Sequence, residues 1–177
     1  QEALWQIVHD NDLPPEKSLR ERDRSRPNAA HWIAGEGWTA SEYGRNFQFD
    51  GNREASSLEF RAPRDTFLPN YGYNPDLVRA TSVNTNRDII SDLNLSLVFI
   101  PDAPDAKVEL ALSSFEHQFR ASLSADGVAE LFYRPDEDQE WTLWSRKQID
   151  PLQEGQCYPL SLAHVDFRVE FRLDGQL

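Results

Sequence analysis

The fold is decided by residues 92–134, DLNLSLVFIPDAPDAKVELALSSFEHQFRASLSADGVAELFYR. Apolar side chains recur there at every second position over successive segments, which is typical of antiparallel strands that bury one face. The turn Ala125-Asp126-Gly127 predicts a hairpin, because Gly tolerates the positive φ that such turns need. We therefore expect a meander of three or four strands. The alternating positions are Leu93, Leu95, Leu97, Phe99, Val108, Leu110, Leu112, Phe119, Ala121 and Leu123. The last segment has Val128, Glu130, Phe132 and Arg134 on one face and Ala129, Leu131 and Tyr133 on the other.

Further alternating segments lie on both sides of this meander. Residues 47–49, FQF, are expected to pair with residues 58–60, LEF, as a second hairpin. Residues 157–164, CYPLSLAH, predict a strand or an edge strand marked by Pro159, and residues 167–173 predict a strand with an apolar face. With about ten strand candidates and no convincing amphipathic helix, the chain is expected to be all-β. The expected architecture is a two-sheet antiparallel sandwich of the jelly-roll or concanavalin/lectin-like type.

Length and composition favour one domain over residues 1–177, since the chain has 177 residues of which 39% are hydrophobic. A long irregular connection is expected over residues 63–91, where prolines and a Tyr-Gly-Tyr sequence interrupt the alternation. The chain contains no Met and ends just after the turn signal Asp174-Gly175. We expect from these two features that it is an excised piece of a larger protein.

The formal net charge of −12 disfavours binding to nucleic acid and to anionic lipid, both of which require a basic surface. No run approaches the roughly 20 apolar residues that a membrane-spanning helix needs, so no direct membrane insertion of this chain is expected. The single Cys157 cannot form an internal disulfide, and its apolar surroundings predict a small core residue.

Motifs that carry chemistry are sparse in this sequence. There is no G-x-S-x-G elbow, no glycine-rich phosphate loop and no supported Ser-Lys dyad, so we expect a non-catalytic chain without a cofactor. Carboxylates such as Asp102, Asp105 and Glu116 could form a glycosidase pair, but nothing in the sequence fixes their separation. No metal site is expected. Asp10 and Asp12 are weak calcium candidates that are more simply turn formers before Pro14-Pro15.

The aromatic residues have two interpretations. The five Trp residues could form a platform for sugars, although at strand spacing such residues more often pack in the core. Ligand binding by residues of the long connection and by Trp side chains is the functional alternative. The candidate binding residues are Trp38, Tyr71, Tyr73, Asn74 and Trp144.

Four strings carry a resemblance to a known family: LWQIVHDNDLPPE, GWTASEYGRNFQFDG, the Tyr-Gly-Tyr-Asn loop before DLNLSLVF, and HVDFRVEFRLDGQL. Through them nearly the whole chain resembles a β-rich insertion found in signal peptidase I-like proteins of planctomycetes. Members of that family use a Ser-Met-x-Pro serine with a lysine base and carry a Gly-Asp-Asn-Arg box. None of these strings occurs here, so no catalytic residue is carried over.

The resemblance implies a membrane-anchored parent that cleaves signal peptides during protein export, with this chain as its accessory domain on the extracytoplasmic side. The implied partner is the catalytic domain of the same parent chain, together with a peptide, a protein substrate or a glycan. A carbohydrate-binding lectin-like module is the alternative function, and a jelly-roll glycoside hydrolase is a third.

Overall fold

The computed structural model describes residues 31–41, 46–51, 55–61, 92–114, 116–166 and 168–175. These residues form eleven strands and no helix, which confirms the all-β prediction, and none of them lies in a helix able to span a membrane. The chain divides into two compact units, Gln1–Ile90 and Ser91–Leu177, which are described separately. The single domain over residues 1–177 therefore stays a prediction. The connection over residues 63–91 lies outside the described residues.

The first unit contains four short strands that pair in a nested order. These are β1 (His31–Ala34), β2 (Trp38–Ala40), β3 (Phe47–Phe49) and β4 (Leu58–Arg61). β2 pairs with β3 and β1 pairs with β4, both antiparallel. The expected hairpin between Phe47–Phe49 and Leu58–Arg61 is therefore wrong. β2 and β3 form the inner pair, next to which the Ser41 amide donates a hydrogen bond to the Asn46 carbonyl, and β1 and β4 form the outer pair.

Aromatic side chains hold this small unit together. The Trp32 ring packs edge-on against Phe60, on the partner strand, with centroids 5.2 Å apart. It also contacts Phe47 on β3 at 6.2 Å, so it bridges the two strand pairs. Trp38 packs against Phe49 across the β2–β3 pair at 5.2 Å. These strands are too short to bury a wide apolar face, and large rings supply the missing contact area.

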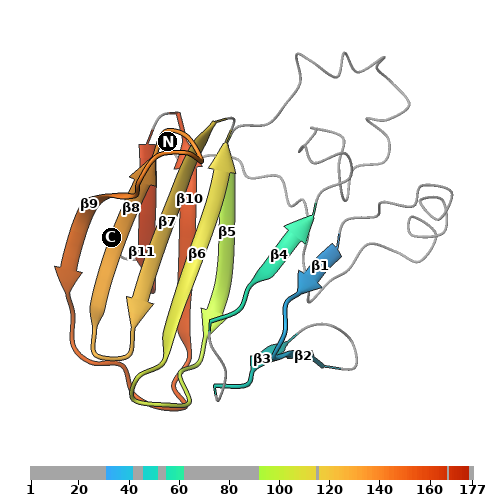
Figure 1. Cartoon of the computed structure of the whole chain (residues 1–177). Coiled ribbons are helices and arrows are strands. Elements are labelled where there is room, and N and C mark those ends of the chain that lie inside the picture. Colours follow the sequence, from blue (N-terminus) through green and yellow to red (C-terminus); the bar gives the residue numbers. More distant parts are fainter. Residues whose placement is uncertain are drawn as a thin grey trace, which may run out of the picture. The chain divides into compact units, whose positions relative to one another are not determined.

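The second unit contains two antiparallel sheets (Figure 1). The four-stranded sheet has the order β6-β7-β8-β9 and the three-stranded sheet has the order β11-β10-β5. The strands are β5 (Leu93–Phe99), β6 (Lys107–Ser114), β7 (His117–Ser124), β8 (Val128–Arg134), β9 (Thr142–Gln148), β10 (Tyr158–Val165) and β11 (Arg168–Leu173).

The meander begins one strand later than the sequence predicts. β6, β7, β8 and β9 follow one another in one sheet, whereas β5 pairs with β10 in the other sheet. The segment between β5 and β6 contains Pro101 and Pro104, and Pro101 is buried. Proline cannot continue a strand ladder, so the chain leaves one sheet here and enters the other. An alternating strand buries the same face in either sheet, so the pattern did not reveal this crossing.

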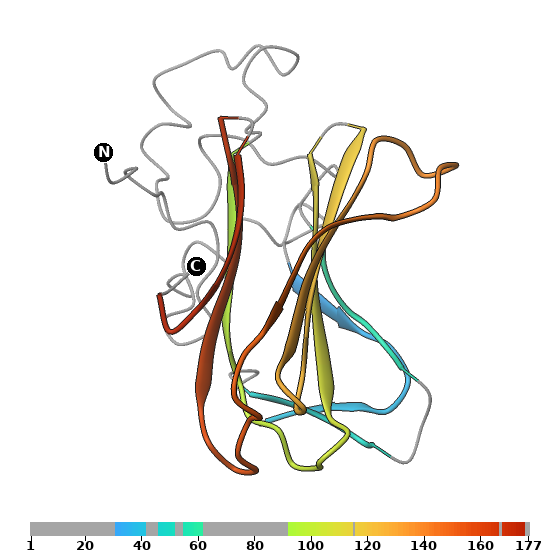
Figure 2. The same ribbon diagram turned by 90° about the vertical axis from the view of Figure 1, so that its left-hand side faces the viewer.

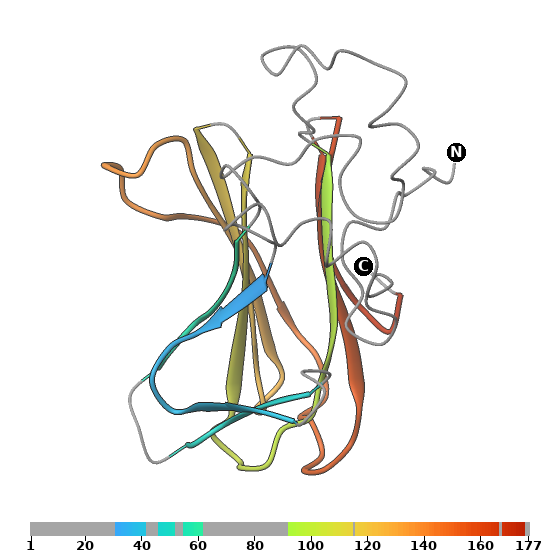
Figure 3. The ribbon, with the colours of Figure 1, turned by 90° about the vertical axis from the view of Figure 1, so that its right-hand side faces the viewer.

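The core lies between the two sheets, which Figures 2 and 3 show edge-on. The four-stranded sheet contributes Leu110, Ala121 and Leu123, and the three-stranded sheet contributes Leu160 and Leu162. These five side chains are at most 2% exposed. The two-sheet sandwich and the predicted buried face of the meander are therefore confirmed for this unit. Whether the whole chain has the jelly-roll or the lectin-like topology stays a prediction.

β10 is the middle strand of its sheet and not an edge strand, although it contains Pro159. The carbonyl of Pro159 accepts a hydrogen bond from the Asp174 amide on the β11 side. The N and C=O of one strand residue point to the same side, so the missing N–H of Pro159 costs no bond to β5. The preceding Cys157 is exposed, which contradicts the expected core position. By strand alternation Cys157 lies on the same side as the exposed Pro159, whereas Tyr158 and Leu160 face the core.

One end of the sandwich is closed by the turn between β7 and β8. The Gly127 amide donates to the Ser124 carbonyl at 2.9 Å, and Gly127 has a φ of 89°, as predicted for this turn. The Gly127 carbonyl accepts from the Ile149 amide at 2.9 Å, and the Ala125 carbonyl accepts from the Leu152 amide at 2.8 Å. The turn is thereby bonded to the segment that leads from β9 to β10. We call this the closed end.

Candidate functional site

The edge strand β9 places a large aromatic side chain on the surface. It pairs with β8 alone among the described strands, and every one of its seven residues is exposed. The pairing register shifts at Leu131 and Phe132, which lie opposite Ser145 and Leu143. Trp144 is therefore the extra residue of a β-bulge, a feature that redirects side chains and recurs at sheet edges and functional sites. Its side chain is 49% exposed.

Trp144 belongs to a group of five rings that we call the aromatic stack. The Trp144 and Tyr133 rings are stacked with centroids 4.4 Å apart, and Tyr133 stacks on Phe119 at 5.6 Å. Phe119 in turn stacks on His164 of β10 at 4.8 Å. The stack therefore connects the edge strand of one sheet to the middle strand of the other. Its members are His117, Phe119, Tyr133, Trp144 and His164.

The positions of these rings follow from strand alternation. His117 and Phe119 share the inner face of β7 with the core residue Ala121. His164 lies two residues beyond the core residue Leu162 on β10. The rings thus continue the core toward the end of the sandwich opposite the closed end. There, aliphatic side chains give way to rings, of which Phe119 is buried and the other four are half-buried or exposed.

A hydrogen bond fixes the outer part of the stack. The His117 Nδ1 atom lies 2.9 Å from the Tyr133 hydroxyl, and the two rings are stacked at 5.8 Å. The exposed His117 ring has no other hydrogen bond to a described residue. The stack therefore offers an apolar indole and an imidazole nitrogen that can still donate or accept. Such a surface can bind a ring-shaped ligand by stacking and by a hydrogen bond.

The structure separates the candidate binding residues. Trp144 lies in the aromatic stack of the second unit, as described. Trp38 lies on β2 in the first unit, where it is half-buried and packs on Phe49. Its Nε1 atom is buried and has no hydrogen-bond partner among the described residues. The remaining candidates, Tyr71, Tyr73 and Asn74, and the calcium candidates Asp10 and Asp12, lie outside the described residues.

Sequence reasoning did not select His117 and Tyr133. Tyr133 was assigned to a strand face, and no spacing in the sequence connects it to His117, which precedes it by sixteen residues. The available signal was the β7–β8 turn: once its register is fixed, Tyr133 lies opposite Phe119. The bulge at Trp144 had no sequence signal, since neither Gly nor Pro marks it.

The glycosidase carboxylates cannot form one site across β6. Asp102 and Asp105 precede this strand and Glu116 follows it. Eight strand residues separate them along a nearly straight segment, which spans about 25 Å at 3.4 Å per residue. Glycosidase pairs require carboxyl groups roughly 5–10 Å apart. Within the described part of the chain, no three His, Cys, Asp or Glu side chains are grouped so as to hold a metal ion.

Comparison with known proteins gives no relative: no family model, no curated protein and no solved structure matches the chain. The function is therefore argued from the geometry of the aromatic stack and from the charge of the chain.

Proposed function

We propose that the sandwich is a non-catalytic carbohydrate-binding module that contacts sugar rings through Trp144. The observation that supports this proposal is the half-exposed indole of Trp144, held against Tyr133 at 4.4 Å on a β-bulge. The C–H-rich face of a pyranose ring is apolar and flat enough to stack on such an indole. The sugar hydroxyls at the ring edge can then bond to nearby polar groups, of which His117 is one.

Preorganisation of the indole supports this assignment. A freely rotating Trp side chain would lose conformational entropy when a ligand binds. Trp144 is held by the Tyr133 ring and by the edge of Phe119 at 6.1 Å, so most of this cost is met on folding. A stacked aromatic pair contributes about 0.5–1.5 kcal/mol beyond the area that it buries.

The charge of the chain favours a ligand of low charge density. At −12 the protein repels polyanions at long range, and a neutral glycan is not subject to that repulsion. Carbohydrate recognition by stacking needs no charge on either partner. The composition and the exposed indole therefore favour the same class of ligand.

The test is a glycan array followed by titration calorimetry of the wild-type chain and the variant Trp144→Ala. We expect a neutral oligosaccharide to bind the wild type and to bind Trp144→Ala at least about tenfold more weakly, which corresponds to about 1.4 kcal/mol. The matched control is Leu143→Ala. Leu143 is the neighbouring residue on β9 and is similarly exposed, at 46%, but it takes no part in the stack.

Two results would contradict the proposal. One is an array on which the wild-type protein binds no glycan. The other is a loss of affinity in Leu143→Ala that equals the loss in Trp144→Ala, because the exposed edge in general and not the indole would then carry the binding.

We also propose that this module is the extracytoplasmic accessory domain of a signal peptidase I-like serine endopeptidase. The strings that carry the resemblance support this assignment: one of them includes β2 and β3, and another includes β11 with the last two residues of β10. The accessory role predicts that the chain alone does not cleave a synthetic signal peptide in a mass-spectrometric assay. Measurable cleavage by the purified chain would contradict this role but would leave sugar binding through Trp144 untouched.

A further inference from the structure

The outer face of the four-stranded sheet has a second group of rings, on the side away from the core. Arg120 lies between the inward-facing Phe119 and Ala121 on β7, so its side chain emerges on this outer face. Its guanidinium lies over the Phe132 ring at 4.6 Å and over the Trp141 ring at 4.7 Å. The Arg134 guanidinium also lies over the Trp141 ring at 4.7 Å. We call these four residues the arginine–aromatic cluster.

The two arginines of the cluster differ in their hydrogen bonds. Arg134 donates from Nε to the Gln118 side chain at 2.7 Å and from Nη1 to the Glu137 carbonyl at 3.0 Å. The Arg120 side chain makes no hydrogen bond to any described residue, and its Nε is buried without a hydrogen-bond partner. Arg134 is thus bonded to two groups of its own sheet, whereas the Arg120 guanidinium is held by two rings and by a long ion pair with Glu109.

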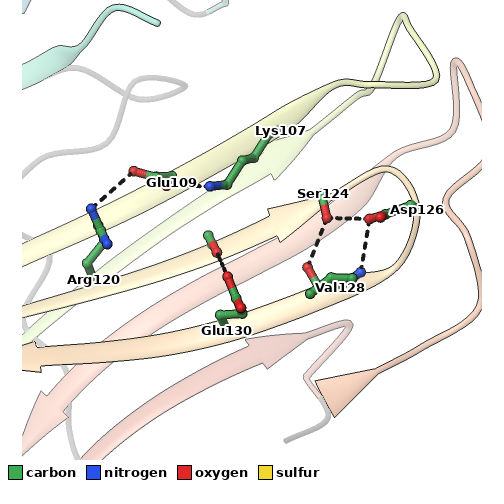
Figure 4. Close-up of polar contacts among 8 residues, drawn as sticks. Lys107, Glu109, Arg120, Ser124, Asp126, Val128 and Glu130 are labelled. Atoms are coloured by element: carbon green, nitrogen blue, oxygen red, sulfur yellow. Dashed lines mark hydrogen bonds and ion pairs between the residues drawn. The ribbon is translucent and has the colours of Figure 1, made fainter. Parts of the chain in front are cut away.

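The carboxylate nearest to Arg120 is already bound to another cation. Glu109 Oε2 lies 4.0 Å from Arg120 Nη1, which is beyond hydrogen-bond distance. The other oxygen of Glu109 lies 2.8 Å from Lys107 Nζ (Figure 4). Glu109 is therefore shared between Lys107 and Arg120, and the closer of its two ion pairs is the one with Lys107. The Arg120 side chain is 28% exposed, so solvent or a ligand can reach part of it.

We propose that Arg120 binds the carboxylate of an acidic sugar at a second site, on the sheet face opposite the aromatic stack. A guanidinium presents its donors in a planar fork that matches the two oxygens of a carboxylate. Phe132 and Trp141 fix the plane of that fork, and the terminal nitrogens supply the donors because Nε is buried. The aromatic neighbours also lower the local exposure to water, which strengthens a charge-assisted bond.

The net charge of the chain favours a ligand with a single carboxylate over a ligand with many negative charges. A densely charged partner, such as an acidic peptide or a sulfated polymer, is repelled by the net charge of −12. A single uronate within an otherwise neutral oligosaccharide encounters little of this repulsion. The ligand class rests on the proposed carbohydrate-binding function, whereas the position of the site rests on the contacts of Arg120 alone.

The test compares two oligosaccharides of equal length, one of which has a single glucuronate side group and one of which has none. Titration calorimetry of the full chain is expected to show about tenfold tighter binding of the glucuronate form, since a charge-assisted hydrogen bond supplies the difference. Arg120→Lys keeps the positive charge but loses the planar set of guanidinium donors. This variant is expected to bind the glucuronate form and the neutral form with similar affinities. Arg146→Lys is the matched control. Arg146 is an exposed arginine that lies 3.7 Å from Glu130 on the same face, and its variant is expected to keep the preference.

A second measurement avoids any variant. In the wild-type protein the side-chain Nε–Hε resonance of Arg120 is expected to shift on titration with the glucuronate form and to stay fixed with the neutral form. Equal loss of preference in Arg120→Lys and Arg146→Lys would overturn the site, because diffuse charge would then explain the binding. Binding of a short poly-aspartate peptide in place of the glucuronate form would overturn the ligand class. If the neutral oligosaccharide does not bind while the glucuronate form does, the Trp144 site is contradicted and the Arg120 site is not.

Discussion

At the scale of single residues, Gly127 illustrates how one position closes the sandwich. Its φ of 89° lies in the left-handed region, which residues with a Cβ rarely adopt. A Cβ built at this position would lie 2.3 Å from the Ile149 carbonyl oxygen and 3.0 Å from that of Asp150. Two separate penalties therefore act on any substitution here: the backbone conformation and the close approach of the segment that follows β9.

We predict that Gly127→Ala destabilises the protein by about 2–4 kcal/mol, measured by urea unfolding. The matched control is Gly155→Ala. Gly155 also has a positive φ, of 74°, but a Cβ there would meet nothing within 4 Å. Its substitution is expected to cost only the conformational part, about 1 kcal/mol. Similar losses in the two variants would show that the contact with Ile149 adds nothing.

The next scale is that of the structural element, and the β7–β8 turn is held by several side-chain and backbone hydrogen bonds. The Val128 amide donates to Asp126 Oδ1 at 3.3 Å, and the Ser124 hydroxyl bonds the same carboxylate (Figure 4). These bonds, with the Ser124 bond first in size, hold the pKa of Asp126 below its ordinary value. The Gln148 side chain also donates to the Asp126 carbonyl at 2.9 Å, which ties the turn to β9.

A lowered pKa in the folded state makes the contribution of Asp126 dependent on pH. The carboxylate stabilises the fold above the ordinary aspartate value of about 4. This stabilisation is lost as the pH falls through the lower, folded-state value, where the group becomes protonated. We predict that Asp126→Asn is less stable than the wild type at neutral pH and that the difference shrinks in acid.

Thermal unfolding from pH 7 down to pH 2 would measure this difference. Asp102→Asn is the control, because Asp102 is exposed and makes no hydrogen bond to a described residue. Its effect on stability is expected to be small at every pH. A difference between Asp126→Asn and the wild type that is constant over the whole range would contradict the role given to the carboxylate.

The edge strand β9 is exposed along its whole length but still holds one aromatic side chain in a fixed position. Its residues lie on the surface, and the bulge at Trp144 redirects one indole onto Tyr133. Bulges and charged residues, here Arg146 and Lys147, also discourage pairing with another edge strand. The element can therefore present an aromatic side chain without offering its backbone for aggregation.

On the scale of the whole molecule, net charge and aromatic content together limit the classes of ligand that the protein is expected to bind. The net charge of −12 disfavours nucleic acid and anionic surfaces, and two of the described ring clusters lie on opposite faces of the four-stranded sheet. The proposed sites share that sheet but differ in chemistry: one presents an indole and the other a guanidinium. A glycan with neutral rings and sparse carboxylates would suit both sites, and the parent protein inferred from the resemblance would present them outside the membrane.

The sequence by itself determined the all-β class, most of the alternating strands of the second unit and the β7–β8 turn. Alternation fixes which side chains face inward, since neighbouring strand residues point to opposite sides. Leu110, Leu123 and Leu162 are accordingly in the core. The Gly in the turn was predictable because only a positive φ closes it.

Only the tertiary structure decided which strands became neighbours. β5 pairs with β10 and not with β6, because an alternating strand fits any sheet that covers its apolar face. For the same reason, the sequence did not predict either candidate site. The bulge that exposes Trp144 depends on the register between β8 and β9, and Arg120 meets Trp141 only once three strands lie side by side. These contacts join residues that are distant in sequence, and local patterns carry no information about them.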